Sequence, residues 1–171
     1  DVPFKVAGDG PVFREMKAQA PQNVEFVGQL KPDQLNQFYE RSRMLVVPSI
    51  CFEQFPMVVL EAMTRALPVI GSRIGGLPEI IERGLTGSLF EPGDSGALAR
   101  QVRCLWEDPQ LCQRMGIAGR QKVMREYTED TYFHNLMVVY QTAMQRCRKG
   151  AGLLPVSSLG ERRARAASAA T

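Results

Sequence analysis

The fold is indicated most clearly by the segment Pro48-Ser49-Ile50-Cys51-Phe52-Glu53-Gln54-Phe55-Pro56-Met57-Val58-Val59-Leu60-Glu61-Ala62-Met63, which follows a short apolar run at residues 44–47. The run predicts a buried strand, and the pattern from residue 57 predicts an apolar helix. In open parallel sheets, ligands bind beyond the carboxyl ends of the strands, where helix N-termini offer unpaired N–H groups and a positive dipole end. Pro56 suits the first helical turn, where its missing N–H costs nothing. The segment therefore predicts a strand, a turn suited to a phosphate and a buried helix, with Glu53 and Glu61 on either side of the turn.

Short apolar runs alternate with helix-length patterns along the chain, which is typical of βαβ units around a parallel sheet. We expect strands at residues 4–7, 24–27, 44–47, 67–70 and 88–90. We expect helices at residues 12–19, 33–41, 57–66, 77–82, 96–106, 109–125 and 131–148. Asp33 has the chemistry of an N-cap for the second helix, and Gly116 and Gly119 predict a break in the sixth. The expected fold class is α/β, a Rossmann-like parallel sheet flanked by helices.

With 171 residues and 44% apolar content, the chain can bury one hydrophobic core. It has no run of about 18 apolar residues, so we expect no membrane-spanning helix, and we expect no signal peptide. The four cysteines form no C-x-x-C pair, and we expect buried free thiols in a reducing compartment. With one histidine and scattered thiols, no metal-ligand cluster can be drawn. We therefore expect a cytoplasmic protein without a metal or another cofactor.

The net charge of +3 is distributed unevenly. Residues 1–145 hold 15 Lys and Arg against 17 Asp and Glu, whereas residues 146–171 hold six against one. The end of the chain is also rich in Ala, Gly and Ser, so we expect a folded domain at residues 1–148 and a disordered basic tail at residues 149–171. Peripheral contact of this tail with the inner face of an acidic membrane is the alternative to a solvated tail. Nucleic acid is not an expected partner, because the folded part is net negative.

Glu61 needs an explanation, because it falls in an expected helix that is apolar nearly all round and should be buried. An ion pair with Arg65 at i,i+4 contributes only about 0.2–0.5 kcal/mol at an exposed site. A wholly buried carboxylate costs several kcal/mol unless it is paired or hydrogen-bonded. From the residues alone, a structural pair with Arg65 and a ligand that donates hydroxyls to Glu61 both remain open.

The spacing Glu53-x7-Glu61 resembles the E-x7-E signature of the retaining family-4 glycosyltransferases. Further motifs resemble landmarks of that family, in its order and at its usual spacing. They are Val6-Ala7-Gly8-Asp9-Gly10-Pro11, Val24-Glu25-Phe26-Val27-Gly28, Pro68-Val69-Ile70-Gly71-Ser72, Gly75-Gly76-Leu77-Pro78-Glu79 and Gly87-Ser88-Leu89-Phe90. The resemblance covers roughly residues 3 to 145 and implies the C-terminal, donor-binding half of a GT-B fold. It aligns the start of this chain with the second strand of that domain, so we expect the domain to be incomplete at its N-terminus.

The resemblance implies that a nucleotide-sugar donor, a UDP- or GDP-sugar, lies along the carboxyl edge of the sheet. Glu53 would be the catalytic residue and would contact hydroxyls of the donor sugar. Glu61 would accept hydrogen bonds from the ribose diol, a charge-assisted and therefore strong interaction. The backbone N–H groups of Phe55, Met57 and Val58 would face the sugar hydroxyls and the diphosphate.

Four of these features have a plainer interpretation. The turn Gly28-Gln29-Leu30 follows the second expected strand, where main-chain groups meet the nucleobase in the family, but an ordinary strand-ending turn would look identical. Glu53 could instead be a partner of the helix dipole, worth about 0.3–1 kcal/mol. Gly75-Gly76 either keeps space open for the donor or forms a plain turn. Gly8-Asp9-Gly10-Pro11 lacks the full G-x-G-x-x-G pattern, which favours a structural turn over a phosphate loop.

The resemblance implies a hexosyltransferase that needs no metal and transfers the sugar to a saccharide or lipid acceptor. In the family, basic residues near the domain's first strand stabilise the leaving diphosphate, and an N-terminal domain binds the acceptor. We expect both to be missing from this chain, which alone should be inactive or bind nucleotide weakly. The alternatives are a nucleotide-sugar epimerase of the same architecture and a non-catalytic Rossmann-like interaction domain.

Overall fold

The computed structural model describes residues 1–148. These residues form an α/β fold with parallel strands and flanking helices, as the sequence predicts. The chain divides into two units, Asp1–Glu126 and Tyr127–Thr171. The described part of the second unit is dominated by one helix, α7 (Glu129–Arg148). The tail expected at residues 149–171 lies outside the described residues.

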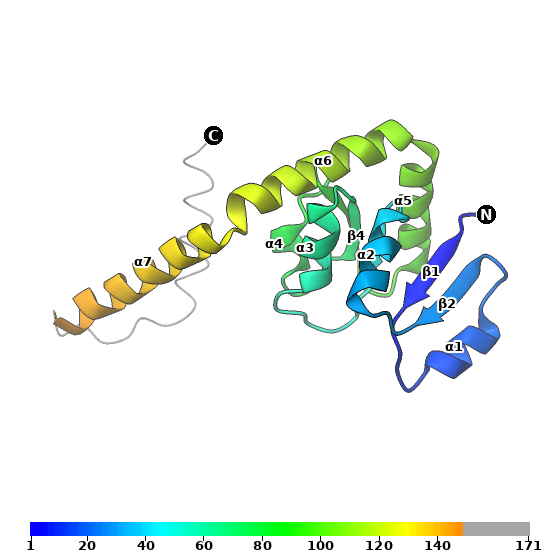
Figure 1. The fold of residues 1–171 in the computed structure, drawn as a ribbon, viewed down its shortest axis with the longest axis horizontal. Coiled ribbons are helices and arrows are strands. Elements are labelled where there is room, and N and C mark those ends of the chain that lie inside the picture. The colour runs from blue at the N-terminus through cyan, green and yellow to red at the C-terminus, as the bar shows by residue number, and fades with distance from the viewer. Residues whose placement is uncertain (149–171) are drawn as a thin grey trace. The chain divides into compact units, whose positions relative to one another are not determined.

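The first unit alternates strands and helices along the chain (Figure 1). Its strands are β1 (Phe4–Ala7), β2 (Val24–Gly28), β3 (Leu45–Val47), β4 (Val69–Ser72) and β5 (Gly87–Phe90). Its helices are α1 (Phe13–Gln19), α2 (Pro32–Glu40), α3 (Met57–Thr64), α4 (Leu77–Ile80), α5 (Ser95–Glu107) and α6 (Pro109–Glu126). Every expected strand and helix is present, and the observed ends differ from the expected ones by at most two residues.

The strands pair in two parallel ladders, whereas the sequence suggested one sheet. β1 pairs with β2, and β3, β4 and β5 pair in that order. Within residues 1–148, no ladder joins β1 or β2 to the other three strands. Pairing is a contact between distant parts of the chain, so apolar runs predict where the strands are but not which of them hydrogen-bond.

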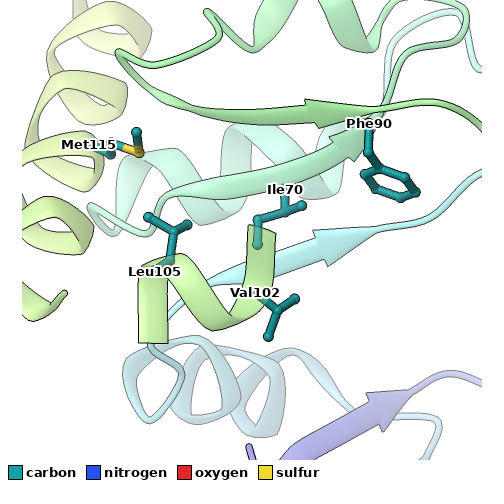
Figure 2. Close-up of a cluster of buried hydrophobic side chains, with 5 residues drawn as sticks. All are labelled: Ile70, Phe90, Val102, Leu105 and Met115. Carbon is teal, nitrogen blue, oxygen red and sulfur yellow. The ribbon is translucent and has the colours of Figure 1, made fainter. Parts of the chain in front are cut away.

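A hydrophobic cluster lies between the three-stranded sheet and helices α5 and α6 (Figure 2). Its buried members are Ile70 of β4, Phe90 of β5, Val102 and Leu105 of α5, and Met115 of α6. Successive residues of a strand point to opposite faces. Ile70 belongs to the cluster with α5, whereas a Cβ on Gly71 would contact the side chains of Leu77 and Ile81 at α4. Helices therefore cover both faces of this sheet, which explains why β4 and β5 are buried along their whole length.

Helix α6 runs unbroken over Pro109–Glu126, so the break expected near Gly116 and Gly119 is wrong. Both glycines are buried where α6 approaches the end of α3. A Cβ on Gly116 would overlap the carbonyl oxygen of Ala66, and one on Gly119 would lie 3.3 Å from Cγ of Met63. These glycines allow close packing of α6 on α3, and this tertiary contact outweighs their low helix propensity.

Helix α2 begins at Pro32 with Lys31 as its N-cap, so the N-cap expected at Asp33 is wrong. Proline has no N–H to lose in a first turn and its φ already suits a helix. The backbone N–H of Lys31 donates to the side chain of Gln34 at 3.0 Å, which closes this end of the helix.

The burial expected for all four cysteines holds only for Cys112, because Cys51, Cys104 and Cys147 are exposed. Burial raises the pKa of the Cys112 thiol, whose sulfur donates to the carbonyl oxygen of Arg43 at 3.1 Å. The sequence places the other three in a loop and two helices but does not determine whether each faces the core or the solvent.

A buried lysine ties α6 to α4. Lys122 is only 5% exposed, and its Nζ lies 2.6 Å from Oε1 of Glu82 and 3.9 Å from Oε2 of Glu126. The same ammonium donates to the carbonyl oxygen of Glu79 in α4 at 3.4 Å. A buried charge requires such partners to offset its desolvation. The cluster therefore holds α4 in place, and the loop that leads into α4 supports the candidate site.

Candidate functional site

The first turn of α3 is exposed, whereas the middle of the helix is largely buried. The side chains of Met57 and Val58 are 56% and 42% exposed, whereas Val59 and Leu60 are buried. The expectation of a helix buried all round is therefore wrong for this turn. Pro56 is the N-cap of α3, with φ −71° and ψ 102°. It was expected within the first turn and lies one position before it. First-turn N–H groups have no acceptor within a helix, so this turn can offer donors to a ligand.

Glu53 lies in the loop before α3 and is held from two sides. Its half-buried carboxylate accepts a hydrogen bond from Ser49 Oγ through Oε1. Its carbonyl oxygen accepts from the N–H of Gly76 at 2.7 Å. A Cβ on Gly75 would overlap the carbonyl oxygen of Glu53, and a Cβ on Gly76 would overlap that of Gln54. The two glycines therefore bring the loop before α4 against the backbone of the Glu53 loop, and Gly75 also has a positive φ of 58°.

Glu61 lies in the second turn of α3, half-buried, and is held by a residue of α2. The hydroxyl of Tyr39 donates to Oε2 of Glu61 at 2.9 Å. Arg65 donates to the carbonyl oxygen of Glu61 at 2.8 Å and to Oδ1 of Asn36. The structural alternative was an ion pair between the Glu61 carboxylate and Arg65. This pair is absent: within residues 1–148, the ion pairs involve other residues.

Tyr39 is a neutral donor at this site. Burial raises the pKa of its phenol, and the hydrogen bond to the Glu61 carboxylate raises it further. The guanidinium of Arg65 lies over the ring, 5.0 Å from its centroid. The phenol therefore keeps its proton at neutral pH and donates a hydrogen bond to Glu61.

Sequence reasoning missed both hydroxyls that hold the two acids. Ser49 is four residues from Glu53, in a loop whose shape the sequence does not specify. Tyr39 is 22 residues from Glu61 and on another helix, so no local pattern points to the contact. A signal for Tyr39 in the sequence is its place beside the apolar Leu35 and Phe38 in the expected helix at residues 33–41.

Within residues 1–148, the hydrogen bonds of Glu53 and Glu61 are made with residues outside the turn Gly28-Gln29-Leu30. Gly28 ends β2 with a positive φ of 73°, and its carbonyl oxygen accepts from the N–H of Gly8 at 2.8 Å. Gln29 is exposed, and Leu30 lines a hollow of about 270 Å³ together with Val27, Phe38 of α2 and Arg41, which follows α2. Neither Glu53 nor Glu61 lines this hollow. The link between the turn and Glu61 is α2, which begins two residues after Leu30 and carries Tyr39.

The loop between β3 and α3 also exposes large apolar side chains. Phe52 is 84% exposed and Phe55 is 49% exposed. Phe55, one of the expected donor-binding residues, therefore lies at the surface beside the exposed first turn of α3. The expected donor-binding residues Glu53, Phe55, Met57, Val58 and Glu61 lie in the loop after β3 and in the first two turns of α3.

Within residues 1–148, no three His, Cys, Asp or Glu side chains gather closely enough to hold a metal ion. No helix there combines the length and the apolar character needed to cross a membrane.

Comparison with known proteins assigns the family. The sequence profile of the family described as Glycosyl transferases group 1 matches residues 1–122. The chain belongs to this family. Its residues Glu53 and Glu61, the exposed turn between them and the glycine pair that supports Glu53 all fall within the matched region.

Relatives of this group 1 glycosyltransferase chain agree in sequence and in fold. N-acetyl-alpha-D-glucosaminyl L-malate synthase of Bacillus anthracis is 30% identical over 155 residues, covering 88% of this chain and 40% of the synthase. Sucrose-phosphate synthase from Thermosynechococcus elongatus is 27% identical with a TM-score of 0.70, covering 82% of this chain and 38% of that one. HepE from Anabaena, solved in complex with UDP, is 23% identical with a TM-score of 0.69, covering 84% of this chain and 41% of HepE. These solved structures share the GT-B fold, which confirms the expected fold class. The chain spans well under half the length of the first curated relatives that it matches.

Proposed function

We propose that this chain is the donor-binding part of a retaining, family-4 glycosyltransferase that works without a metal. The observation that carries the proposal is the pair Glu53 and Glu61. These carboxylates flank the exposed first turn of α3 at the carboxyl end of β3, and each has one oxygen held by a hydroxyl of the chain. That edge is where ligands of open parallel sheets bind. Group 1 membership makes a nucleotide-sugar the ligand that fits it.

Each residue of the site has a proposed role. Glu61 accepts hydrogen bonds from the ribose diol, and Glu53 accepts them from hydroxyls of the donor sugar near the bond that breaks. The backbone N–H groups of Phe55, Met57 and Val58 face the sugar and the diphosphate, helped by the positive end of the α3 dipole. Main-chain groups of Gly28-Gln29-Leu30 meet the nucleobase.

The donor that we propose is a UDP- or GDP-hexose, and the acceptor is a saccharide or a lipid-linked saccharide. UDP is the first nucleotide to test because HepE, which shares the fold, was solved with UDP. We propose that residues 1–148 make up the donor domain and that the whole transferase also needs an acceptor domain, because the chain covers only a part of each relative. The two separate ladders of the sheet are consistent with a donor domain that is completed by a further strand.

The proposal is tested by calorimetric titration of the chain with UDP, GDP, UDP-glucose and GDP-mannose. Glu61→Gln should weaken every ligand that the chain binds by about tenfold or more, because a hydrogen bond to a charged group contributes about 1.5–3 kcal/mol. Glu53→Gln should weaken the nucleotide-sugar more than the nucleotide, because only the sugar reaches Glu53. Glu40→Gln is the matched control, because Glu40 is an exposed acid at the end of α2.

Two results would count against the proposal. If the chain binds none of the four ligands, it is not a donor-binding domain by itself. If Glu61→Gln and Glu40→Gln bind the nucleotide equally well, Glu61 is not a ribose ligand, and a non-catalytic Rossmann-like domain becomes the better reading.

A further inference from the structure

Tyr39 is a buried side chain that donates a hydrogen bond to one acid of the candidate site. It is 3% exposed, and its hydroxyl donates to Oε2 of Glu61 at 2.9 Å. A buried phenol hydroxyl requires a hydrogen-bond partner. The partner here is one of the two acids to which the proposed function gives a role, although the two residues lie on different helices.

A second set of contacts fixes the same pair. Arg65 of the α3 C-terminus lies over the Tyr39 ring at 5.0 Å and donates to Oδ1 of Asn36 on α2. It also donates to the carbonyl oxygen of Glu61 at 2.8 Å. Helix α2 is therefore clamped to α3 by contacts among four residues, Asn36 and Tyr39 of α2 with Glu61 and Arg65 of α3 and its end.

The clamp leaves one carboxylate oxygen of Glu61 available. Oε2 accepts from Tyr39, and within residues 1–148 no hydrogen bond reaches Oε1. A carboxylate with two oxygens has about four sites for donors. One fixed donor on Oε2 restricts rotation of the group and leaves the remaining sites for the hydroxyls of a ligand.

We propose that Tyr39 is a positioning residue that fixes the Glu61 carboxylate for a ribose diol and links it to the turn Gly28-Gln29-Leu30 through α2. This inference rests on the proposed function, because it assumes that Glu61 binds ribose. Helix α2 begins at Pro32, two residues after the turn proposed for the nucleobase, and Tyr39 lies in its last turn. Helix α2 therefore connects the turn proposed for the nucleobase with the tyrosine that holds Glu61, the residue proposed for the ribose.

Tyr39 acts as a neutral hydrogen-bond donor and not as a phenolate. Burial and the Glu61 carboxylate both raise the pKa of the phenol, so it remains a donor over the neutral pH range. Phenylalanine keeps the ring and the stacking of Arg65 and removes only the hydroxyl. Tyr39→Phe is thus the variant that separates positioning from packing.

The test compares ribose and dideoxyribose nucleotides on the chain and its variants by calorimetry. The ligands are UDP and 2′,3′-dideoxy-UDP, with GDP and 2′,3′-dideoxy-GDP if the chain prefers guanine. The proteins are the wild type, Tyr39→Phe, Glu61→Gln, the double variant, and Tyr140→Phe as a control, because Tyr140 is an exposed tyrosine of α7. A melting curve by circular dichroism verifies that each variant is folded.

We expect Tyr39→Phe to bind UDP about three- to tenfold more weakly and dideoxy-UDP unchanged, so that the preference for ribose shrinks. In the Glu61→Gln background, Tyr39→Phe should cause no further loss, because the two residues act as one unit. Tyr140→Phe should match the wild type. A purely structural tyrosine would weaken both nucleotides equally or alter only the melting temperature.

The outcomes separate the inference from the proposed function. If the wild type prefers UDP to dideoxy-UDP, Glu61→Gln abolishes that preference and Tyr39→Phe retains it, the inference is wrong and the proposed function stands. If the wild type binds both nucleotides alike, or neither, ribose recognition by Glu61 is wrong and the inference falls with it.

Discussion

A carboxylate recognises a particular hydroxyl best when its own orientation is fixed before the ligand arrives. Glu53 and Glu61 each have one oxygen engaged by a side-chain hydroxyl of the chain, Ser49 for Glu53 and Tyr39 for Glu61. Both acids are half-buried, so their hydrogen bonds are less screened than those of surface acids. At the scale of residues, the site consists of two oriented acids on either side of one exposed helical turn.

The buried phenol of Tyr39, hydrogen-bonded to Glu61, predicts a specific pH dependence of stability. The folded state raises the pKa of Tyr39 above the ordinary tyrosine value of about 10. Stabilisation by the phenol is therefore fully present below pH 10 and is lost as the pH rises further, because the unfolded chain ionises there first. We expect the free energy of unfolding to fall by up to about 1.4 kcal/mol more per pH unit above 10 in the wild type than in Tyr39→Phe.

The measurement is urea unfolding of both proteins between pH 7 and 11, with Tyr140→Phe as the control. At pH 7 the wild type should be more stable than Tyr39→Phe by about 1 kcal/mol, and the gap should close above pH 10. A gap that is independent of pH would contradict the raised pKa of the buried Tyr39 phenol.

The sequence predicts the two acids of this site, Glu53 and Glu61, but not the hydroxyl groups that orient them. Glu53 and Glu61 stand at a recognisable spacing within an apolar pattern, and an acid in an apolar helix calls for an explanation. Ser49 and Tyr39 are ordinary residues whose roles depend on the shape of a loop and on the packing of two helices. The Gly75-Gly76 turn could likewise be placed, but its contact with the backbone of Glu53 is visible only in three dimensions.

At the scale of elements, the C-terminus of α3 has an unusual residue in its capping turn. The N–H groups of Ala66 and Leu67 donate to the carbonyl oxygens of Met63 and Ala62 at 2.9 and 3.1 Å, which is a Schellman motif. Ala66 has a φ of 56°, the only positive φ outside glycine within residues 1–148. An L-residue in this conformation costs roughly 1–2 kcal/mol, and glycine avoids most of that cost.

We expect Ala66→Gly to raise the free energy of unfolding by about 0.5–1 kcal/mol, after the larger entropy of unfolded glycine is subtracted. The melting midpoint should rise by a few degrees, to be measured by calorimetry. Ala62→Gly, in the buried middle of the same helix, is the control and should lower the midpoint. A decrease for Ala66→Gly would show that the turn is not strained.

The contact between α6 and α3 predicts that alanine is destabilising at Gly116 of α6 but tolerated at Gly119 of the same helix. Gly116→Ala should cost about 1–3 kcal/mol, because its Cβ would overlap the rigid carbonyl oxygen of Ala66. Gly119→Ala should stay within about 1 kcal/mol of the wild type, because the flexible side chain of Met63 can move and alanine favours the helix. Urea unfolding compares them, and equal stability of the two variants would contradict the packing.

Most elements could be predicted from the sequence, because each has its own apolar period. The errors have physical causes. Gly116 and Gly119 suggested a break because glycine is a poor helix former, but close packing uses them inside an unbroken helix. Asp33 suggested an N-cap, but Pro32 already starts the helix. The separation of the strands into two ladders depends on pairing between distant segments, which local patterns do not encode.

At the scale of the whole molecule, donor binding and sugar transfer are separate properties. The chain spans 40% of the length of the Bacillus anthracis synthase and 38% of sucrose-phosphate synthase. We propose that this part binds the donor and that the acceptor contacts, and the cations expected beside the leaving diphosphate, come from other parts of a complete transferase. Charge stabilisation of a leaving group is usually the largest single contribution to such catalysis.

We therefore expect the 171-residue chain alone to transfer no sugar above background from UDP- or GDP-hexoses to simple saccharides. Release of UDP or GDP, followed by a coupled assay, measures transfer and hydrolysis together. The variant Glu53→Gln gives the background. Turnover that depends on Glu53 would mean that the 171-residue chain contains the catalytic groups. It would contradict the proposal that other parts of a complete transferase supply them.

The most direct test of donor binding is hydrogen exchange of the chain with and without UDP, GDP and a panel of their sugars. Backbone amides from Glu53 to Glu61 and from Gly28 to Leu30 should exchange more slowly with the preferred nucleotide, while those of α5 should not change. Sugar-bearing donors should add protection around Glu53. No change in either segment with any of these ligands would contradict the claim that this edge of the sheet binds a nucleotide-sugar.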